Sequence, residues 1–499
     1  MLRLVSHPIG RLPSIPPRAV VWRPELDSAL VDAPGTEPLR ARLREPGALV
    51  VTTGQQPGLF TGPLYTVHKA LSAAALAMVL ERRWKRPVVP LFWIAGDDHD
   101  YAEASSATWV DQVGTLIDWH LPPRPVSAPQ LPMYQVSLPA DILVGLEQLG
   151  ASLPPGPRAD EVLDWLGRHY LPGRSIHHAF AGALAELLAP VGVLCFDPTC
   201  AAAKRAQAPI LAEALRQASA LDQVLAALPE PGTGIATGED ASLVFMTSAA
   251  GRDRLMIDGP AFRTRRSGER FTLLELESLL QREPERFSAN VLLRPVVEAA
   301  LLPTVAYAAG PAEERYLDKQ SIALYARFDV VRQVPVPRWS GTVIAPWAER
   351  LLERLGIDAG QVLHDDGALA RTILERDFPA DARQALDALT KQIARSAGVV
   401  GAAGKRIDPV LVRAIAGRMQ RLNEITEQID SSLQRHLRRR TNIAHAQYQR
   451  LLQGLRPRGN PQERILINPV FLGRFGAAWL NAVYDAAQRW ADALPQAAE

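Results

Sequence analysis

The sequence predicts an α/β protein, with a mainly parallel sheet core that carries insertions and a C-terminal α-helical coiled-coil arm. The core is predicted by short apolar, β-branched runs that alternate with helical patterns. This alternation is typical of a parallel sheet with helices on both faces. The arm is predicted by the stretch after Arg338, where strand patterns stop and helical periodicity continues from about Pro346 to Leu455.

The composition of the 499 residues, 47% hydrophobic and 22% charged, is that of an ordinary soluble protein with room for more than one domain. The net charge of +2 does not favour a nucleic-acid partner or a membrane-adsorbing face. The two cysteines, Cys195 and Cys200, argue against a disulfide scaffold and fit a reducing compartment. Because residues 1–22 are interrupted by prolines, we expect no secretory signal and a cytoplasmic protein.

The chain from Ala48 to Trp84 predicts a strand, a glycine-rich turn and a helix. The run Ala48–Thr53 is short and β-branched, as in a buried parallel strand. The turn matches neither common nucleotide-binding fingerprint, but it precedes a helix that begins near Pro63 and would present free backbone N–H groups to an anion. The binding candidates in the turn are Gly54, Gln55, Gln56, Gly58 and Gly62.

Four polar residues at three- and four-residue spacing share one face of this helix: Tyr65, His68, Lys69 and Ser72. They either face the same pocket as the turn or form a polar strip on a half-exposed helix, and spacing alone does not decide. Lysine is rare here, with six in the chain, so Lys69 and Lys319 inside motifs are chemical candidates. Lys204 lies outside the motifs and is expected on the surface.

A second apolar run, Val88–Ala95, ends in Gly96-Asp97-Asp98-His99-Asp100. Ligands of open α/β sheets bind beyond the carboxyl ends of strands, so we expect the active site here and at the glycine turn. One reading is a metal site, in which His99 and a carboxylate hold a divalent ion. Another is metal-free: His99 stabilises a developing charge or moves a proton, oriented by Asp97 or Asp100. A third is a helix N-cap, and one aspartate is expected to cap.

The rest of the core continues the alternation of strands and helices. Strands are predicted at Leu116–His120, Met133–Leu138, Val191–Phe196, Ala241–Thr247, Arg254–Asp258, Asn290–Leu293 and Pro303–Ala308. Helices are predicted at Asp160–Tyr170, Ile176–Leu188, Ala201–Ala227 and Leu273–Arg282.

A third polar cluster, Gly310–Tyr316, follows the last of these strands and opens another helix, with Gly310 and Glu313 as binding candidates. Arg294 either binds a carboxylate or phosphate bidentately or forms a structural ion pair with Glu298. In the tail, Gln462-Glu463-Arg464 either closes over the core or caps the last helix.

Apolar positions seven residues apart predict a long amphipathic helix, which follows a break near Gly398–Asp408. The positions are Ile415, Leu422, Ile429, His436 and Ile443. We expect this helix to pair with Ala380–Arg395 and to form a homodimer through its apolar stripe. The predicted parts are a core over 1–345, the arm over 346–455, and a tail over 456–499 that docks back on the core.

Four stretches of the chain resemble the BshC family, the cysteine-adding enzymes of bacillithiol biosynthesis. The stretches are TGQQPGLFTGPLYTVHK, PVVPLFWIAGDDHDYAEA, NVLLRPVVEAALLPTVAYAAGPAEERY and PQER. The resemblance covers essentially the whole chain. It implies a Rossmann-like core, a coiled-coil dimerisation arm, and addition of cysteine to glucosaminyl-malate. Asp97 stands where the family usually has glutamate, and Ala312 where it usually has a second glycine, and neither change removes a chemical function.

An amide bond does not form from a free carboxylate in water, so the resemblance suggests a ligase that uses ATP or another nucleotide. The Gly54–Gly62 turn and Lys69 would hold phosphates, and His99 would stabilise the activation transition state. The catalytic candidates are His99, Asp98, Asp100 and Lys69, and the binding candidates outside the turn are Tyr65, His68, Asp97, Arg294, Gly310 and Glu313. The metal requirement stays open. The alternatives are a nucleotidylyl- or aminoacyl-transferring enzyme with another substrate and a metal-dependent hydrolase.

Overall fold

The computed structural model describes residues 2–7, 12–17, 21–229, 233–365, 367–369 and 380–495. The chain divides into two compact units, Leu2–Val343 with Asn460–Glu499, and Ile344–Gly459. The first unit contains the residues of the candidate site, and the second is largely helical.

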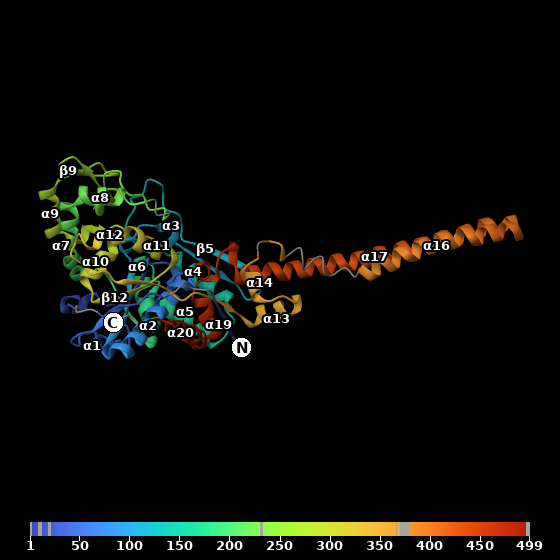
Figure 1. Cartoon of the computed structure of the whole chain (residues 1–499), viewed down its shortest axis with the longest axis horizontal. Helices are drawn as coiled ribbons and strands as arrows, with labels where there is room; N and C mark the ends of the chain where they lie inside the picture. Colours follow the sequence, from blue (N-terminus) through green and yellow to red (C-terminus); the bar gives the residue numbers. More distant parts are fainter. Residues whose placement is uncertain are drawn as a thin grey trace. The chain divides into compact units, whose positions relative to one another are not determined.

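A five-stranded sheet in the order β13-β12-β2-β3-β6 forms the centre of the first unit. Its strands are β2 (Leu49–Gln55), β3 (Val88–Ile94), β6 (Leu194–Phe196), β12 (Thr304–Ala309) and β13 (Val334–Pro337), and all neighbours are parallel. Every residue of β3 is buried, as expected for a strand covered on both faces. Helices α2 (Leu64–Trp84) and α11 (Pro311–Tyr316) pack against β12, and α6 (Ile176–Leu188) packs against β6; the three helices are labelled in Figure 1. The predicted Rossmann-like sheet is confirmed.

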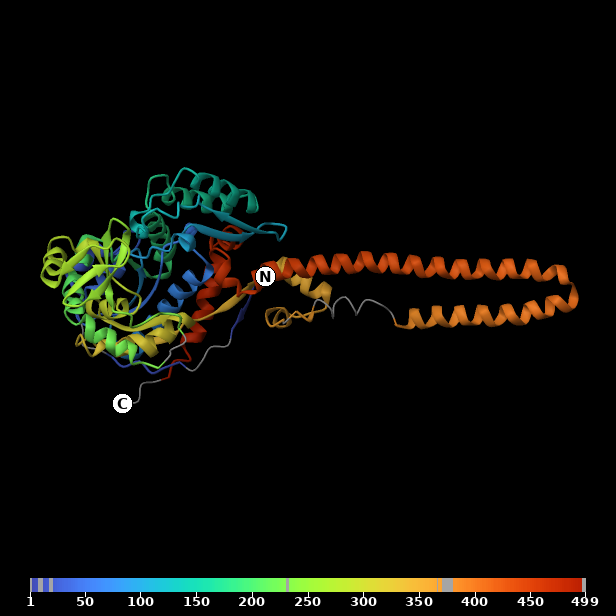
Figure 2. The ribbon, with the colours of Figure 1, turned by 90° about the horizontal axis from the view of Figure 1, so that it is seen from above.

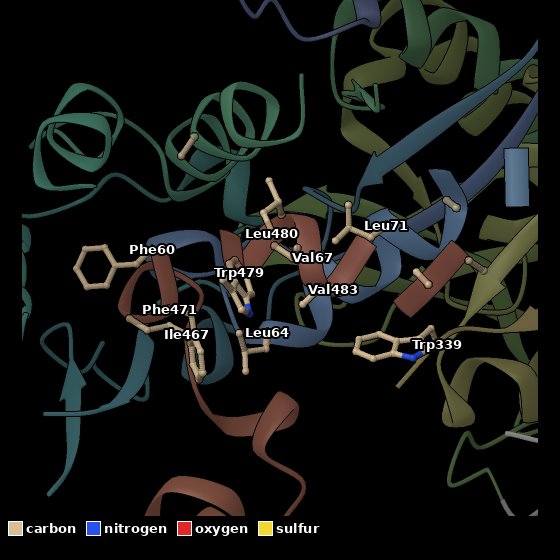
Figure 3. Close-up of a cluster of buried hydrophobic side chains, with 14 of the residues drawn as sticks. Phe60, Leu64, Val67, Leu71, Trp339, Ile467, Phe471, Trp479, Leu480 and Val483 are labelled. Carbon is tan, nitrogen blue, oxygen red and sulfur yellow. The ribbon is translucent and has the colours of Figure 1, made fainter. Parts of the chain in front are cut away.

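Helix α2 (Leu64–Trp84) packs against β2 and β3 and is buried over most of its length. Its many alanines allow this close packing on the sheet. Helix α20 (Ala477–Ala491), from the end of the chain, packs on α2. Figure 3 shows Leu64 and Val67 of α2 beside Trp479 and Val483 of α20, all members of one hydrophobic core. Segments from opposite ends of the chain therefore share one core.

A second five-stranded sheet, in the order β10-β9-β8-β7-β11, is antiparallel. Its strands are β7 (Ala241–Ser248), β8 (Gly251–Asp258), β9 (Ala261–Thr264), β10 (Arg270–Thr272) and β11 (Phe287–Ala289). Only Ala249 and Ala250 separate β7 from β8, and so short a connection permits only an antiparallel pair. The strand β7 and part of β8 match predicted strands, but a separate antiparallel sheet was not predicted.

Four predicted elements are wrong in type or extent. The predicted strand Val191–Phe196 is a strand only over β6, because its first residue belongs to the 3-10 turn η4 (Ala189–Val191). Met133–Leu138 begins with the 3-10 helix η3 (Met133–Gln135), and its Met133 N–H bonds the carbonyl of Asp98 instead of a neighbouring strand. Asn290–Leu293 is a turn, because the Asn290 side chain accepts the N–H groups of Leu292 and Leu293 ahead of α10 (Arg294–Leu301). The predicted helix Ala201–Ala227 is two helices, α7 (Ala201–Arg216) and α8 (Ala218–Ala226).

The remaining strands form two two-stranded sheets, β1 (Arg3–Ser6) with β14 (Gly341–Ile344) and β4 (Ser106–Val110) with β5 (Leu116–His120). β14 is a strand beyond Arg338, where none was predicted. The other helices are α1 (Glu37–Leu43), α3 (Tyr101–Ala104), α4 (Ile142–Ser152), α5 (Pro157–His169), α6 (Ile176–Leu188), α9 (Leu273–Arg282), α11 (Pro311–Tyr316), α12 (Ile322–Tyr325), α18 (Gln462–Ile465) and α19 (Pro469–Phe475). Short 3-10 or π turns are η1 (Pro24–Ala29), η2 (Leu59–Thr61), η4 (Ala189–Val191), η5 (Pro284–Arg286) and η6 (Leu317–Ser321).

The second unit contains α13 (Pro346–Leu355), α14 (Ala359–Leu363), α16 (Ala380–Ile407), α17 (Pro409–Leu455) and the turn η7 (Pro457–Gly459). Figure 2 shows α16 and α17 side by side as a long hairpin. The predicted break near Gly398–Asp408 is wrong in extent, because α16 stays helical to Ile407. A Cβ at Gly404 would lie 2.4 Å from Ile415, so glycine lets the two helices approach near the turn. The side chain of His436, predicted at the seam, lies outside the described residues.

None of the described helices combines the length and the apolar character that a membrane crossing needs.

Candidate functional site

A cavity of about 240 Å³ lies at the ends of the central strands. Residues of β2, of the loop after β3 and of α11 line it, together with residues of the antiparallel sheet and α10. Seven of the predicted site residues are among the lining: Gly54, Gln55, Gln56, Asp97, Asp98, Arg294 and Glu313. We call this cavity and its lining the crevice.

Gly54 is required by the close approach of two strands. It sits opposite Trp93 in the β2–β3 ladder, and a Cβ at this position would lie 2.8 Å from the Trp93 carbonyl oxygen. Glycine therefore brings the end of β2 against β3 and sets Gln55 and Gln56 at the crevice.

Lys69 is buried beside the crevice and forms an ion pair with Glu313, with 2.6 Å between Nζ and Oε2. The same ammonium donates to the Gly54 carbonyl at 2.9 Å and to Gln55 Oε1 at 3.0 Å. Glu313 also accepts the Tyr307 hydroxyl and the Gly310 backbone N–H. Burial alone would raise the pKa of Glu313, but the charge of Lys69 and these hydrogen bonds hold it below its usual value. The first and third predicted clusters therefore meet at this pair.

Arg294 forms the predicted ion pair with Glu298, and the prediction that it binds a carboxylate or phosphate ligand stays a prediction. Its guanidinium pairs with the buried Glu298 at 2.6 Å and also lines the crevice. It lies over the Tyr307 ring, 5.3 Å from the centroid, so Arg294 is held in place from two sides.

The three aspartates of the loop after β3 have separate partners. Asp97 pairs with Lys204, with 2.6 Å between Oδ1 and Nζ. Asp98 Oδ1 accepts the backbone N–H groups of His99 and Asp100, which fixes the turn of the loop. Asp100 accepts the Glu103 N–H and caps α3, so the predicted N-cap is confirmed and the Asp100 carboxylate points at the helix.

Lys204 corrects the expectation of a surface lysine. It is only 1% exposed and also donates to the Phe287 carbonyl at 2.8 Å. The helix α7 that carries it packs against β11, and nothing in the local sequence distinguishes this lysine from an exposed one.

His99 contacts Arg252, a residue that was not predicted to belong to the site. Arg252, on β8, places its NH1 3.1 Å from His99 Nδ1 and lines the crevice. Burial and the Arg252 charge lower the pKa of His99, with a weaker opposing effect from Asp98. Arg252 alternates with Arg254 along an ordinary strand pattern, so no sequence signal points to it.

Eight of the predicted site residues are not among those that line the crevice: Gly58, Gly62, Tyr65, His68, Lys69, His99, Asp100 and Gly310. The N-terminus of α2 is not a free anion site, because Leu64 N–H bonds the Leu466 carbonyl and Thr66 N–H bonds the Pro63 carbonyl. The prediction of free N–H groups there is therefore wrong for these two residues. Tyr65 is linked to the crevice through Gln55, whose amide donates to the Tyr65 hydroxyl at 2.9 Å.

His68 takes part in a different, buried cluster. Its Nδ1 lies 2.8 Å from Glu463, which also binds Arg338 through two hydrogen bonds. Glu463 belongs to the Gln462-Glu463-Arg464 stretch, so this stretch closes over the core. Burial alone would raise the pKa of Glu463, but Arg338 and His68 hold it well below its usual value.

The predicted convergence holds by direct contact. Glu313 lines the crevice, Lys69 contacts Glu313, and His99 contacts the lining residue Arg252. Among the described residues, the only set of three or more side chains placed to share a metal ion is His177, His178 and Asp197, outside the crevice lining. The Nε2 of His177 lies 3.0 Å from Asp197, and its buried Nδ1 has no partner.

Comparison with known proteins identifies two domain families along the chain. The N-terminal Rossmann-like domain of bacillithiol biosynthesis BshC matches residues 36–338, and the C-terminal coiled-coil domain of the same protein matches residues 341–491. A protein of Solibacter usitatus named "Putative cysteine ligase BshC" is 31% identical over 481 residues, or 94% of this chain and 88% of that protein. A protein of the same name from Heliobacterium modesticaldum is 31% identical over 482 residues, covering 90% of this chain and 83% of that protein.

Proposed function

The chain belongs to the bacillithiol biosynthesis BshC family, and we propose that it is a ligase that joins cysteine to glucosaminyl-malate through an amide bond. The observation that carries the proposal is the convergence of the three motifs on one crevice. Small-molecule substrates fit a cavity of about 240 Å³ lined by both cationic and anionic side chains.

The reaction needs an activated carboxyl group, and we propose ATP or another nucleotide as the activating substrate. The cysteine carboxylate oxygen attacks a phosphorus of the nucleoside triphosphate and takes its phosphoryl or nucleotidyl group, and the nucleoside diphosphate or pyrophosphate leaves. The sugar amine then attacks the carbonyl carbon, that oxygen leaves with the transferred group, and the nitrogen loses a proton. Arg252 and Arg294 are the guanidinium groups that line the crevice, and they suit phosphate or carboxylate oxygens. In this proposal the two guanidinium groups bind the phosphate oxygens. The N-terminus of α2 was expected to do so, but its Leu64 and Thr66 N–H groups are already hydrogen-bonded within the protein.

The acidic side of the crevice suits the amines of the two substrates. Asp97 and Glu313 are each bound to a lysine, whereas Asp98, which also lines the cavity, has no ion pair with any of the described lysines. Its second carboxylate oxygen is therefore the group we assign to an ammonium or amine of cysteine or glucosamine. Asp100, which caps α3, is less suited to this role.

The test is to incubate the purified protein with cysteine, glucosaminyl-malate and ATP and to analyse the products by mass spectrometry. We expect a product with the mass of the two substrates less one water. The same incubation with other amines in place of glucosaminyl-malate tests a transferase with a different substrate. Hydrolysis products that disappear on chelation would support the metal-dependent hydrolase instead. No condensation product with any of several nucleotides would contradict the ligase assignment.

We further propose a homodimer through α16 and α17. Along α17, Leu422, Ile425 and Ile429 are each between 44% and 48% exposed although α16 already packs against this helix. Their spacing places them on one stripe, and an apolar stripe of this kind usually has a partner. A nucleotide-dependent biosynthetic ligase with free cysteines would work in the cytoplasm.

A further inference from the structure

We propose that Arg252 holds His99 as the neutral imidazole with its proton on Nε2, so that His99 donates a hydrogen bond to the substrate and does not act as a base. The tautomer follows from contacts within the chain. Only the role toward substrate rests on the proposed ligase function.

The hydrogen bond between the two side chains fixes the direction of donation. A guanidinium group has only N–H donors, so Arg252 NH1 donates and His99 Nδ1, 3.1 Å away, accepts. A neutral imidazole carries one N–H, which must then be on Nε2.

Arg252 is itself held firmly in this position. Its Nε donates to the Ser288 hydroxyl at 3.0 Å, and its NH2 donates to the Ala289 carbonyl at 2.8 Å. Its guanidinium also lies 4.1 Å from the centroid of the Phe245 ring. The antiparallel sheet therefore supplies the group that orients a residue of the parallel sheet's loop.

No aspartate of the loop is placed to accept a proton from His99. Asp98 Oδ1 is 3.9 Å from His99 Nδ1, beyond hydrogen-bond distance, and it already accepts two backbone N–H groups. Asp97 is bound to Lys204, and Asp100 caps α3. The sequence allowed His99 to move a proton while Asp97 or Asp100 oriented it. Neither aspartate is placed to orient His99 in this way.

The charges around His99 also disfavour an imidazolium. Arg252 and Arg266 oppose its formation, whereas Asp98 and Asp100 favour it, and burial together with Arg252 outweighs the two carboxylates. His99 Nε2 has no hydrogen-bond partner among the described residues, and the side chain is 28% exposed. A neutral N–H beside the crevice mouth can thus donate to an oxygen that gains negative charge during carboxyl activation.

The tautomer is tested by ¹⁵N magic-angle-spinning NMR of the full-length protein labelled in its histidine rings. The His99 signals are assigned by difference from His99→Gln. We expect a protonated Nε2 and an unprotonated Nδ1 at pH 7, and loss of this pattern in Arg252→Met. The matched control is Arg254→Met, because Arg254 also lies over the Phe245 ring, at 5.5 Å, and has no contact with His99. A proton on Nδ1 in the native protein, or an unchanged pattern in Arg252→Met, would overturn the proposal.

The donor role is tested by turnover of two amide variants. A glutamine amide can place its NH₂ group near the position of Nε2, whereas an asparagine amide reaches only the position of Nδ1. We expect His99→Gln to retain at least about 10-fold more kcat than His99→Asn, since a single donor to a developing charge is worth about 100-fold or more. Equal loss in both variants would contradict the donor role. If the native protein forms no condensation product, the ligase assignment fails, and the NMR result still decides the tautomer.

Discussion

At the scale of single residues, two histidines of the motif region, His99 and His68, have very different surroundings. His99 is partly exposed, and within the described part of the chain its side chain is hydrogen-bonded to Arg252; His68 is fully buried between Glu463 and Trp339. These surroundings fit the proposed catalytic role of His99 and a structural role of His68, and the two roles predict different responses to substitution.

Replacing His99 with alanine should reduce turnover and leave the fold intact. The lost donor is worth about 3–4 kcal/mol of transition-state stabilisation, so we expect kcat to fall by about 10²–10³-fold. The melting temperature should stay close to the native value, because a partly exposed side chain with one polar partner contributes little to stability. Steady-state kinetics and thermal unfolding on the same preparations check this. A large fall in melting temperature would instead assign His99 a structural role.

His68 should make the protein less stable as the pH falls from 7 to 5. Burial lowers the pKa of His68 below that of the unfolded chain, about 6.5. The neutral His68 side chain therefore makes its full contribution to the free energy of unfolding above pH 6.5. This contribution is lost as the pH falls toward the pKa of His68 in the folded protein. The neutral form is favoured because protonation would bury an N–H on Nε2, which has no partner, so the free energy of unfolding should decrease between pH 7 and pH 5.

The variant His68→Asn isolates this effect. An asparagine amide can still donate to Glu463 from near the position of Nδ1, but it does not titrate. Denaturant unfolding at pH 7 and pH 5 should show a smaller difference for His68→Asn than for the native protein. The exposed His120 provides the control, since His120→Asn should keep the native difference. A native-sized difference in His68→Asn would contradict the assignment.

At the scale of elements, the tail completes the core around α2. Trp479 of α20 is fully buried against the face of α2, whereas Trp490 at the end of the same helix is partly exposed. We expect Trp479→Ala to lower the free energy of unfolding by about 3–5 kcal/mol, and Trp490→Ala to cost clearly less. Denaturant midpoints of both variants test this, and equal losses would show that α20 does not depend on this contact.

Element prediction from the sequence succeeded where burial is uniform and failed where side chains decide the backbone. β2, β3 and β12 were predicted nearly to the residue, because strands covered on both faces are continuous apolar runs. The Asn290–Leu293 segment is also apolar, yet the Asn290 side chain turns it into a cap. The composition of the segment does not distinguish a strand from a helix cap, because the capping role of Asn290 depends on where α10 begins.

The site residues, too, could be predicted only in part from the sequence. The loop after β3 was predicted, and so were Lys69 and Glu313 as separate candidates, because strand ends of a parallel sheet meet at one edge; the ion pair between the two side chains was not predicted. Arg252 and Lys204 were not predicted either, because their roles arise from the packing of β8 and α7 against that edge. Arg252 and Lys204 lie near the motifs because of contacts between segments that are far apart in the sequence. The residues next to them in the sequence therefore do not predict their positions.

At the scale of the whole molecule, the chemistry and the proposed dimer contact belong to different units. Every residue that lines the crevice lies between Gly54 and Tyr316, in the first unit, whereas the exposed apolar stripe lies on α17 in the second. Changes to the stripe should therefore alter assembly and leave the crevice residues unchanged.

The double substitution Ile425→Asp with Ile429→Asp should convert the dimer to a monomer. Two carboxylates on an apolar seam would have to be buried without partners, which costs several kcal/mol per charge and exceeds what a helical stripe contributes. Light scattering after gel filtration should report the monomer mass of 54.5 kDa for this variant and twice that for the native chain. The control is Gln428→Asp, which adds a charge at an exposed polar position on the same helix and should stay dimeric. Because both isoleucines lie outside the first unit, the monomer should keep its ligase turnover, and a native protein that is already monomeric would refute the proposed dimer.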